Sequence, residues 1–324
     1  MLGHKTHTDI TMLNGVTTAT KTTNALGQST ATTIAPLRGL PLTTTDLNSV
    51  TSAMRYDGLG RTTAVWGASR PTTQSANAQF SYQISATVPS AVTTKVLNDS
   101  VGYVTSTALF DAMLRPIQTQ KPTPQGGRLV TNTFYDTRGW VWKTNNPWWD
   151  SKSAPNGTLV GVDDAQVPDQ NVIAFDGVGR QVLSTSYFQS QVKEQTATAY
   201  YGDRTVTVPP TGGVATQTFT DALGRTTETD QYTTSPTVSV SAGSGQAPIT
   251  TVSITGGSTK AVTSPPSTDK TQGVSYTFDT LGHPAEVTNL ASGDVWHTDY
   301  DTLGQVTGKK EAACPARPVR PGGA

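Results

Sequence analysis

One short motif recurs along the chain and limits its fold more than any other feature: an aromatic residue, Asp, two variable residues, Gly and then Arg. Two copies are complete, at Tyr56–Arg61 and at Phe175–Arg180. With five altered copies the motif occurs seven times in 324 residues. Such repetition indicates a repeat architecture, in which each copy is one structural unit that must stack on its neighbours to bury its apolar face.

The altered copies depart from the motif in different ways. Phe110–Arg115 lacks the Gly, Tyr135–Trp140 lacks the Arg, Phe278–His283 and Tyr300–Gln305 replace the last residue, and Phe219–Arg225 carries one extra Thr. Weaker copies lie at 98–103 and 24–28. We assign the following residues to the repeat turns: Tyr56, Asp57, Gly60, Arg61, Phe110, Asp111, Arg115, Tyr135, Asp136, Gly139, Phe175, Asp176, Gly179, Arg180, Phe219, Asp221, Gly224, Arg225, Phe278, Asp279, Gly282, Tyr300, Asp301 and Gly304.

Asp followed three residues later by Gly predicts a type I turn, with Asp capping the turn's N–H groups and Gly taking a positive φ. A turn of this kind with a Gly bulge closes a β-hairpin. Before the turn, Val274, Tyr276 and Phe278 alternate with polar residues, as in a half-buried strand. The motif aromatic is therefore expected to end a core-facing row. The motif Arg is expected to pair with the Asp or to stack on a neighbouring aromatic.

Composition supports many short strands and turns. Charged residues make up only 14% of the chain, against about 25% in an average globular protein, while Gly and Pro number 30 and 20. The net charge of +0 gives no basic footprint, so we expect neither nucleic acid nor an anionic membrane as a partner. No apolar run approaches the ~18 residues of a membrane-spanning segment. A single cysteine, Cys314, excludes an internal disulfide.

The repeated residues closely resemble the tyrosine-aspartate (YD) repeats of bacterial Rhs proteins, which are also found in insecticidal toxin-complex C components and in animal teneurins. The resemblance covers roughly residues 51–310. It implies an all-β fold of antiparallel hairpins in a sheet that spirals into a hollow shell, of which this chain would be an arc. In that family the shell commonly encloses a C-terminal toxin and keeps it inactive until delivery.

Two departures qualify the resemblance. The family's Asp-Pro-x-Gly-Leu autocleavage motif and the toxin are missing, and after Gln305 the chain soon becomes rich in Pro and Gly. The chain is therefore expected to be an interior or truncated segment of a larger Rhs polypeptide, whose other repeats and toxin would be its partners. We expect it to be secreted or at the cell surface, although no signal peptide is visible.

Three regions are expected along the chain. Residues 1–50 would form degenerate strands of the same sheet, residues 51–310 the YD-repeat region, and residues 311–324 a disordered tail. The segments 121–127, 150–170 and 235–267 interrupt the repeats and are interpreted as long hairpin loops or excursions from the sheet.

The sequence contains no credible catalytic, cofactor or metal constellation. The repeated Asp lacks the Gly-rich nonapeptide register of calcium-binding repeats. His4 and His7 have no Cys or third His nearby and lie in a terminal segment. No Gly-x-Ser-x-Gly elbow precedes a helix. The leading hypothesis is thus a non-enzymatic scaffold, and a hydrolase is retained only because Rhs parents can cleave themselves.

Four of the six tryptophans lie between Trp140 and Trp149. Trp140 and Trp142 share one strand face and are expected to pack. Trp148 and Trp149 follow a Pro and precede a polar loop, so they could either pack or form an exposed sugar-binding platform. The alternative function is accordingly a cell-surface adhesion or carbohydrate-binding module with surface glycans as partners.

Overall fold

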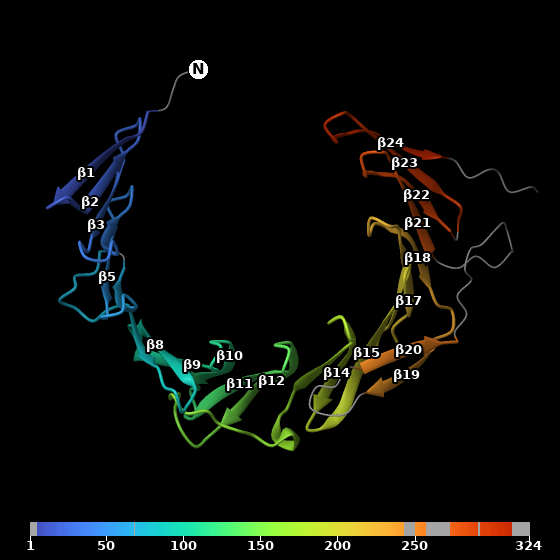
Figure 1. The fold of residues 1–324 in the computed structure, drawn as a ribbon, viewed down its shortest axis with the longest axis horizontal. Helices are drawn as coiled ribbons and strands as arrows, with labels where there is room; N and C mark the ends of the chain where they lie inside the picture. Colours follow the sequence, from blue (N-terminus) through green and yellow to red (C-terminus); the bar gives the residue numbers. More distant parts are fainter. Residues whose placement is uncertain (1–4, 68, 243–249, 257–272, 291, 313–324) are drawn as a thin grey trace, which may run out of the picture. The chain divides into compact units, whose positions relative to one another are not determined.

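The computed structural model describes residues 5–67, 69–242, 250–256, 273–290 and 292–312. Within these residues the chain is almost entirely β, and its one helix is the three-residue 3-10 turn η1 (Asp164–Gln166). A long antiparallel sheet contains 22 strands, and a separate hairpin forms a two-stranded sheet. The predicted all-β, antiparallel fold is confirmed. Within each unit, Figure 1 shows the strands following one another in chain order, except that the β19–β20 hairpin lies beside β14 and β15.

The chain divides into two compact units, Met1–Thr133 with Asn145–Asp163 and Phe134–Thr144 with Asp164–Ala324. The strands up to the division are β1 (His7–Leu13), β2 (Val16–Thr23), β3 (Ser29–Ile34), β4 (Pro41–Thr45), β5 (Thr51–Tyr56), β6 (Thr62–Trp66), β7 (Ala78–Gln83), β8 (Ser90–Asn98), β9 (Gly102–Phe110), β10 (Pro116–Pro122), β11 (Arg128–Tyr135) and β12 (Val141–Asp150). β11 and β12 each have residues in both units.

The remaining strands belong to the second unit. They are β13 (Gln170–Phe175), β14 (Gln181–Phe188), β15 (Gln191–Tyr200), β16 (Arg204–Val208), β17 (Thr216–Thr220), β18 (Thr226–Gln231), β19 (Thr237–Ala242), β20 (Thr250–Thr255), β21 (Gly273–Phe278), β22 (Pro284–Asn289), β23 (Val295–Tyr300) and β24 (Val306–Ala312). β24 extends two residues into the region expected to be a tail, and residues 313–324 lie outside the described residues.

Strands adjacent in sequence pair antiparallel, as in the β5–β6 and β13–β14 hairpins. One exception occurs at β18, which pairs with β21 because the β19–β20 hairpin leaves the sheet between them. The register shifts at the aromatic end of the repeat hairpins, for example before Tyr56 and before Phe175. This shift is the bulge that the motif predicts, because a Gly in the left-handed conformation adds one residue to one side of the hairpin.

A single sheet with both faces open buries few side chains, so buried clusters form only where another segment covers the sheet. In the second unit the β19–β20 hairpin lies over β13, β14 and β15. Its Val252 and Ile254 are buried against a cluster that includes Val182, Ala197 and Val206. The hairpin lies within the interruption at 235–267, and the alternating Val238 and Val240 of β19 are the sequence signal for its first strand.

In the first unit the chain after β12 also lies on the sheet. Residues 156–160 hydrogen-bond to side chains of β10 and β11, so this part of the expected excursion at 150–170 is held against a sheet face. Residues 1–50 contain β1 to β4, which pair in the main sheet.

Candidate functional site

The recurring structural site is the repeat turn, and the copy at Asp57 shows its geometry. Asp57 Oδ1 accepts hydrogen bonds from the backbone N–H groups of Leu59 and Arg61, both at 2.9 Å. Asp57 Oδ2 accepts from Arg61 Nε at 2.7 Å. Gly60 donates its N–H to the Asp57 carbonyl at 3.1 Å and has a φ of 84°. One aspartate therefore holds the whole turn, as the spacing predicts.

The same arrangement recurs along the chain. The copies that share both backbone bonds to Oδ1 begin at Asp111, Asp136, Asp176, Asp221, Asp279 and Asp301. In the copies that end in Arg, the Arg Nε also reaches Oδ2 at 2.7 Å.

Two copies that lack a motif residue still form the turn. Leu114 stands where Gly is expected and adopts a φ of 60°, and its N–H still reaches the Asp111 carbonyl at 3.0 Å. In the copy without a terminal Arg, Arg138 lies two residues earlier and donates from Nε to Asp136 Oδ2 at 2.7 Å. The local hydrogen-bond pattern therefore tolerates loss of one element of the motif.

Hydrogen bonds to the carboxylate hold the pKa below the ordinary value at six turn aspartates: Asp57, Asp111, Asp136, Asp176, Asp221 and Asp279. For Asp57 and Asp221 the backbone N–H of the motif Arg is the main cause. For Asp176 partial burial acts in the opposite direction, but the N–H and side chain of Arg180 outweigh it. These carboxylates are ionised at neutral pH, which is the state that accepts the capping bonds.

In three copies the motif Arg also lies over an aromatic ring from a later strand. The guanidinium of Arg61 is 4.5 Å from the centroid of Tyr82, that of Arg180 is 4.4 Å from Tyr200, and that of Arg225 is 4.4 Å from Phe278. The two roles expected for this Arg, pairing with Asp and stacking on an aromatic, are thus combined in one side chain.

Two residues that replace the Arg also contact an aromatic ring, Trp140 in a tilted arrangement and His283 in a stacked one. Trp140 lies 5.1 Å from the ring of Phe175, and His283 stacks on Tyr300 at 4.8 Å. The stacked side chain also closes the space beside the next Gly, because a Cβ at Gly179 would lie 2.6 Å from Trp140 and one at Gly304 would lie 2.7 Å from His283. Glycine is needed at these two turns for space as well as for φ.

Tyrosine hydroxyl groups add a second link between neighbouring hairpins. Tyr82, Tyr200 and Tyr300 donate to the carbonyl oxygens of residues 62, 181 and 284, at 2.8, 3.1 and 3.0 Å. Each of these carbonyls belongs to the residue after the stacked side chain. The motif aromatics are only half-buried, as at Phe175 and Phe278, so the expected core-facing row is instead a row of rings covered on one side by the preceding turn.

The sequence analysis missed one copy of the turn. Asp46 Oδ1 accepts the N–H groups of Asn48 and Val50 at 2.8 and 2.9 Å, and Ser49 takes the Gly position with a φ of 64°. The Asp-x-x-Ser spacing was the available signal, but a Thr precedes the Asp in place of an aromatic.

The tryptophan platform is not formed. Trp148 is 7% exposed and donates from Nε1 to Asn132 Oδ1 at 2.9 Å, whereas Trp149 is 55% exposed. They point to opposite sides because successive residues of a strand alternate in direction, and β12 runs through both positions. Trp140 and Trp142 are half-buried and pack on Phe175 and Phe134, respectively.

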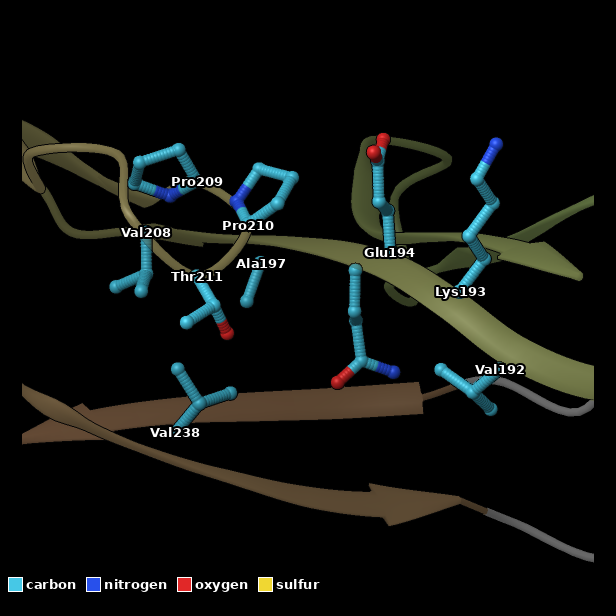
Figure 2. A pocket seen from close by; sticks show the side chains of 10 residues that line it. Val192, Lys193, Glu194, Ala197, Val208, Pro209, Pro210, Thr211 and Val238 are labelled. Carbon is cyan, nitrogen blue, oxygen red and sulfur yellow. The ribbon is translucent and has the colours of Figure 1, made fainter.

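A cavity of about 430 Å³ lies between the main sheet and the β19–β20 hairpin. Val208, Pro209 and Val238 contribute apolar surface to it. Figure 2 shows Lys193 and Glu194 at its side, pointing away from Val238. No group of three or more His, Cys, Asp or Glu that could hold a metal ion occurs among the described residues. Nor does any helix in the described part of the chain have the length and apolarity needed to cross a membrane.

No family model matches this sequence, and no curated protein matches it. Solved structures do share its fold. A chain in the crystal structure of TcdB2–TccC3 aligns over 94% of this chain with a TM-score of 0.53 and 14% identity. The crystal structure of TcdB2–TccC3–Cdc42 gives 94%, 0.52 and 12%. The Photorhabdus luminescens Tc holotoxin pore with a mutated TccC3 gives 96%, 0.53 and 12%.

This chain spans 19–21% of the length of those chains. At such low identity the comparison establishes a common fold and nothing finer. The structures of that fold are Tc toxin assemblies, and toxin-complex C components are among the proteins whose YD repeats the sequence resembles.

Proposed function

We propose that this chain is a non-enzymatic scaffold: a segment of an Rhs-type YD-repeat shell that encloses a C-terminal toxin and helps deliver it outside the cell or at its surface. The observation that carries the proposal is the chain of interlocked repeat turns. Each turn is closed by its own Asp, and in five turns the last motif residue covers an aromatic ring of a following strand. This arrangement specifies a continuing sheet and assigns no chemistry to the repeated residues.

The low charge of the chain and the recurring geometry of its turns are consistent with a structural role as the wall of a shell. In the copies that end in Arg, the Asp and Arg form an ion pair, so these copies contribute little net charge to either face of the sheet. A sheet without net charge would not attract an enclosed polypeptide electrostatically over long distances. The fold shared with Tc toxin assemblies supports the same proposal.

The first test is to sequence the gene beyond this chain. Reading past the codon for Ala324 in all three frames should reveal further YD repeats followed by a toxin domain. If no frame contains another repeat, a shell is ruled out for this chain.

The second test is protease protection in the longer polypeptide. Its C-terminal toxin should resist added protease, and Phe278→Ala, which removes the ring under Arg225, should expose it. Val178→Ser is the matched control, because Val178 lies in a turn and is 74% exposed. Equal digestion of the toxin in unmodified and Phe278→Ala polypeptides would contradict enclosure.

The adhesion or carbohydrate-binding alternative has lost its two-ring platform, and Trp149 is its remaining exposed ring at this site. A glycan-array signal that disappears in Trp149→Ala but persists in Phe188→Ala, a change at another exposed aromatic, would favour it over the scaffold.

A further inference from the structure

The face formed by β10 and β11 in the first unit carries a buried polar site. Gln118, Gln120 and Arg128 are at most 4% exposed. Arg128 donates from Nε to Asp150 Oδ2 at 2.8 Å and from Nη1 to Gln120 Oε1 at 2.9 Å. Gln120 Nε2 donates to Gln118 Oε1 at 2.7 Å. The side chains therefore fix one another, and the direction of both amides is set by the Arg128–Asp150 ion pair.

These fixed amides bind the backbone of residues 156–160. Gln120 Oε1 accepts the N–H of Asn156 at 2.8 Å, and Gln120 Nε2 donates to the Thr158 carbonyl at 2.9 Å. Gln118 binds both groups of Val160, accepting its N–H at 3.2 Å and donating to its carbonyl at 2.7 Å. The bonded residues are every second one. The glutamines thus bind the backbone groups of a segment that is bent at residues 157 and 158, where the Thr158 N–H donates to Asn156 Oδ1 at 2.9 Å.

Two further contacts select the side chains of the segment. Arg128 Nη1 donates to Asn156 Oδ1 at 3.0 Å, so this contact favours a residue with a side-chain oxygen at position 156. A Cβ on Gly157 would lie 2.7 Å from Gln83 Oε1, so a small residue fits best there. Leu159 is 47% exposed and makes no contribution to recognition of this kind.

We propose that Gln118, Gln120 and Arg128 form a binding site for a polypeptide that carries Asn followed by Gly in the bent conformation of residues 156–160, and that these residues fill the site in cis. The segment is a removable strap. When it leaves, the amides and the guanidinium lose the partners that the segment supplies, so the empty site favours another chain that offers the same groups. This inference comes from the first unit's own contacts and is independent of the proposed shell.

The test uses the full chain with Asn156→Pro and Val160→Pro, which remove the two backbone N–H groups that Gln120 and Gln118 accept. This variant should bind a fluorescently labelled peptide of residues 152–163 at least roughly tenfold more tightly than the unmodified chain, whose site is filled. Adding Gln120→Ala to the variant should abolish the gain. A peptide with Asn156→Ala should bind roughly tenfold more weakly than the natural peptide.

A second variant protects the test from misfolding. Asn156→Pro leaves the sheet intact but removes the N–H bound by Gln120 and the oxygen bound by Arg128, so it should also gain peptide binding. Circular dichroism confirms the β-fold of each variant. If either folded variant shows no gain, or if the peptide with Asn156→Ala binds as tightly as the natural one, the proposal is wrong and the strap is only a loop that packs on the sheet.

Discussion

At the scale of single residues, the Gly position of the turn tolerates substitution only with strain, and Leu114 is the strained case. Its φ of 60° is unfavourable for a branched side chain, and the side chain is 68% exposed, so little packing compensates. Leu114→Gly should raise the free energy of unfolding by about 1 kcal/mol. Denaturant titration measures the change.

The matched control is the reverse substitution at a turn that has Gly. Gly179→Ala places a Cβ at a φ of 88° and 2.6 Å from Trp140, so it should destabilise the chain by about 1–3 kcal/mol. If both substitutions shifted stability in the same direction, the turn assignment would be wrong.

A buried acidic pair predicts a pH effect. Asp230 is fully buried, its carboxylate has no hydrogen-bond partner among the described residues, and Glu228 lies two residues away on the same strand face. Burial and then the charge of Asp230 raise the pKa of Glu228 to about 7. The unfolded chain loses this proton first as pH rises, so the stabilisation is complete below about pH 4.5 and is lost through about pH 7.

Glu228→Gln should therefore make the free energy of unfolding fall less between about pH 5 and about pH 8 than it does in the unmodified chain. The measurement is denaturant titration at both pH values. Asp57→Asn serves as the comparison, because the pKa of that carboxyl is lowered and its effect is confined to acid. An unchanged pH slope in Glu228→Gln would show that Glu228 ionises normally.

At the scale of elements, neighbouring hairpins are coupled through the stacked side chains. Arg225 is bound to Asp221 and lies over Phe278, which belongs to a strand that follows the β19–β20 hairpin. A double-mutant cycle of Arg225→Ala and Phe278→Ala should give a coupling free energy of about 0.5–1 kcal/mol. A second cycle of Arg225→Ala and Phe175→Ala is the control, because these two residues are not in contact. Equal coupling free energies in the two cycles would show that the Arg225–Phe278 contact is not specific.

The β19–β20 hairpin is an element stabilised by burial on the sheet. Ile254 is 8% exposed in the cluster with Val182 and Val206. Ile254→Ala should destabilise the second unit by about 2–4 kcal/mol, measured by thermal and denaturant unfolding. Val240→Ala, at a position 45% exposed in the same hairpin, should cost much less. Similar losses would mean that the hairpin does not depend on this cluster.

At the scale of the whole molecule, the end strands have consequences for association. Every residue of β1 is exposed, including Ile10 and Met12 at 56% and 60%, and β1 pairs with β2 on one side within its unit. An exposed apolar strand edge is a template for another strand. The isolated chain should self-associate at micromolar concentration in sedimentation, and Ile10→Lys with Met12→Lys should reduce this. A monomer in both cases would refute the expectation.

What the sequence by itself determined is the turn and the strands that it joins. The capping bonds of Asp57 close within four residues, and alternation along a strand is likewise local, so neither needs the rest of the fold. The environments of Trp148 and Glu228 could not be predicted in this way. Only the tertiary structure shows that Trp148 is buried beside Asn132 and that Glu228 shares a strand face with the buried Asp230. The strap at 156–160 depends on glutamines some 40 residues away, 42 in the case of Gln118 and Val160. Such partners are set by how strands stack, because burial and pairing arise between segments whose separation in sequence carries no periodic signal.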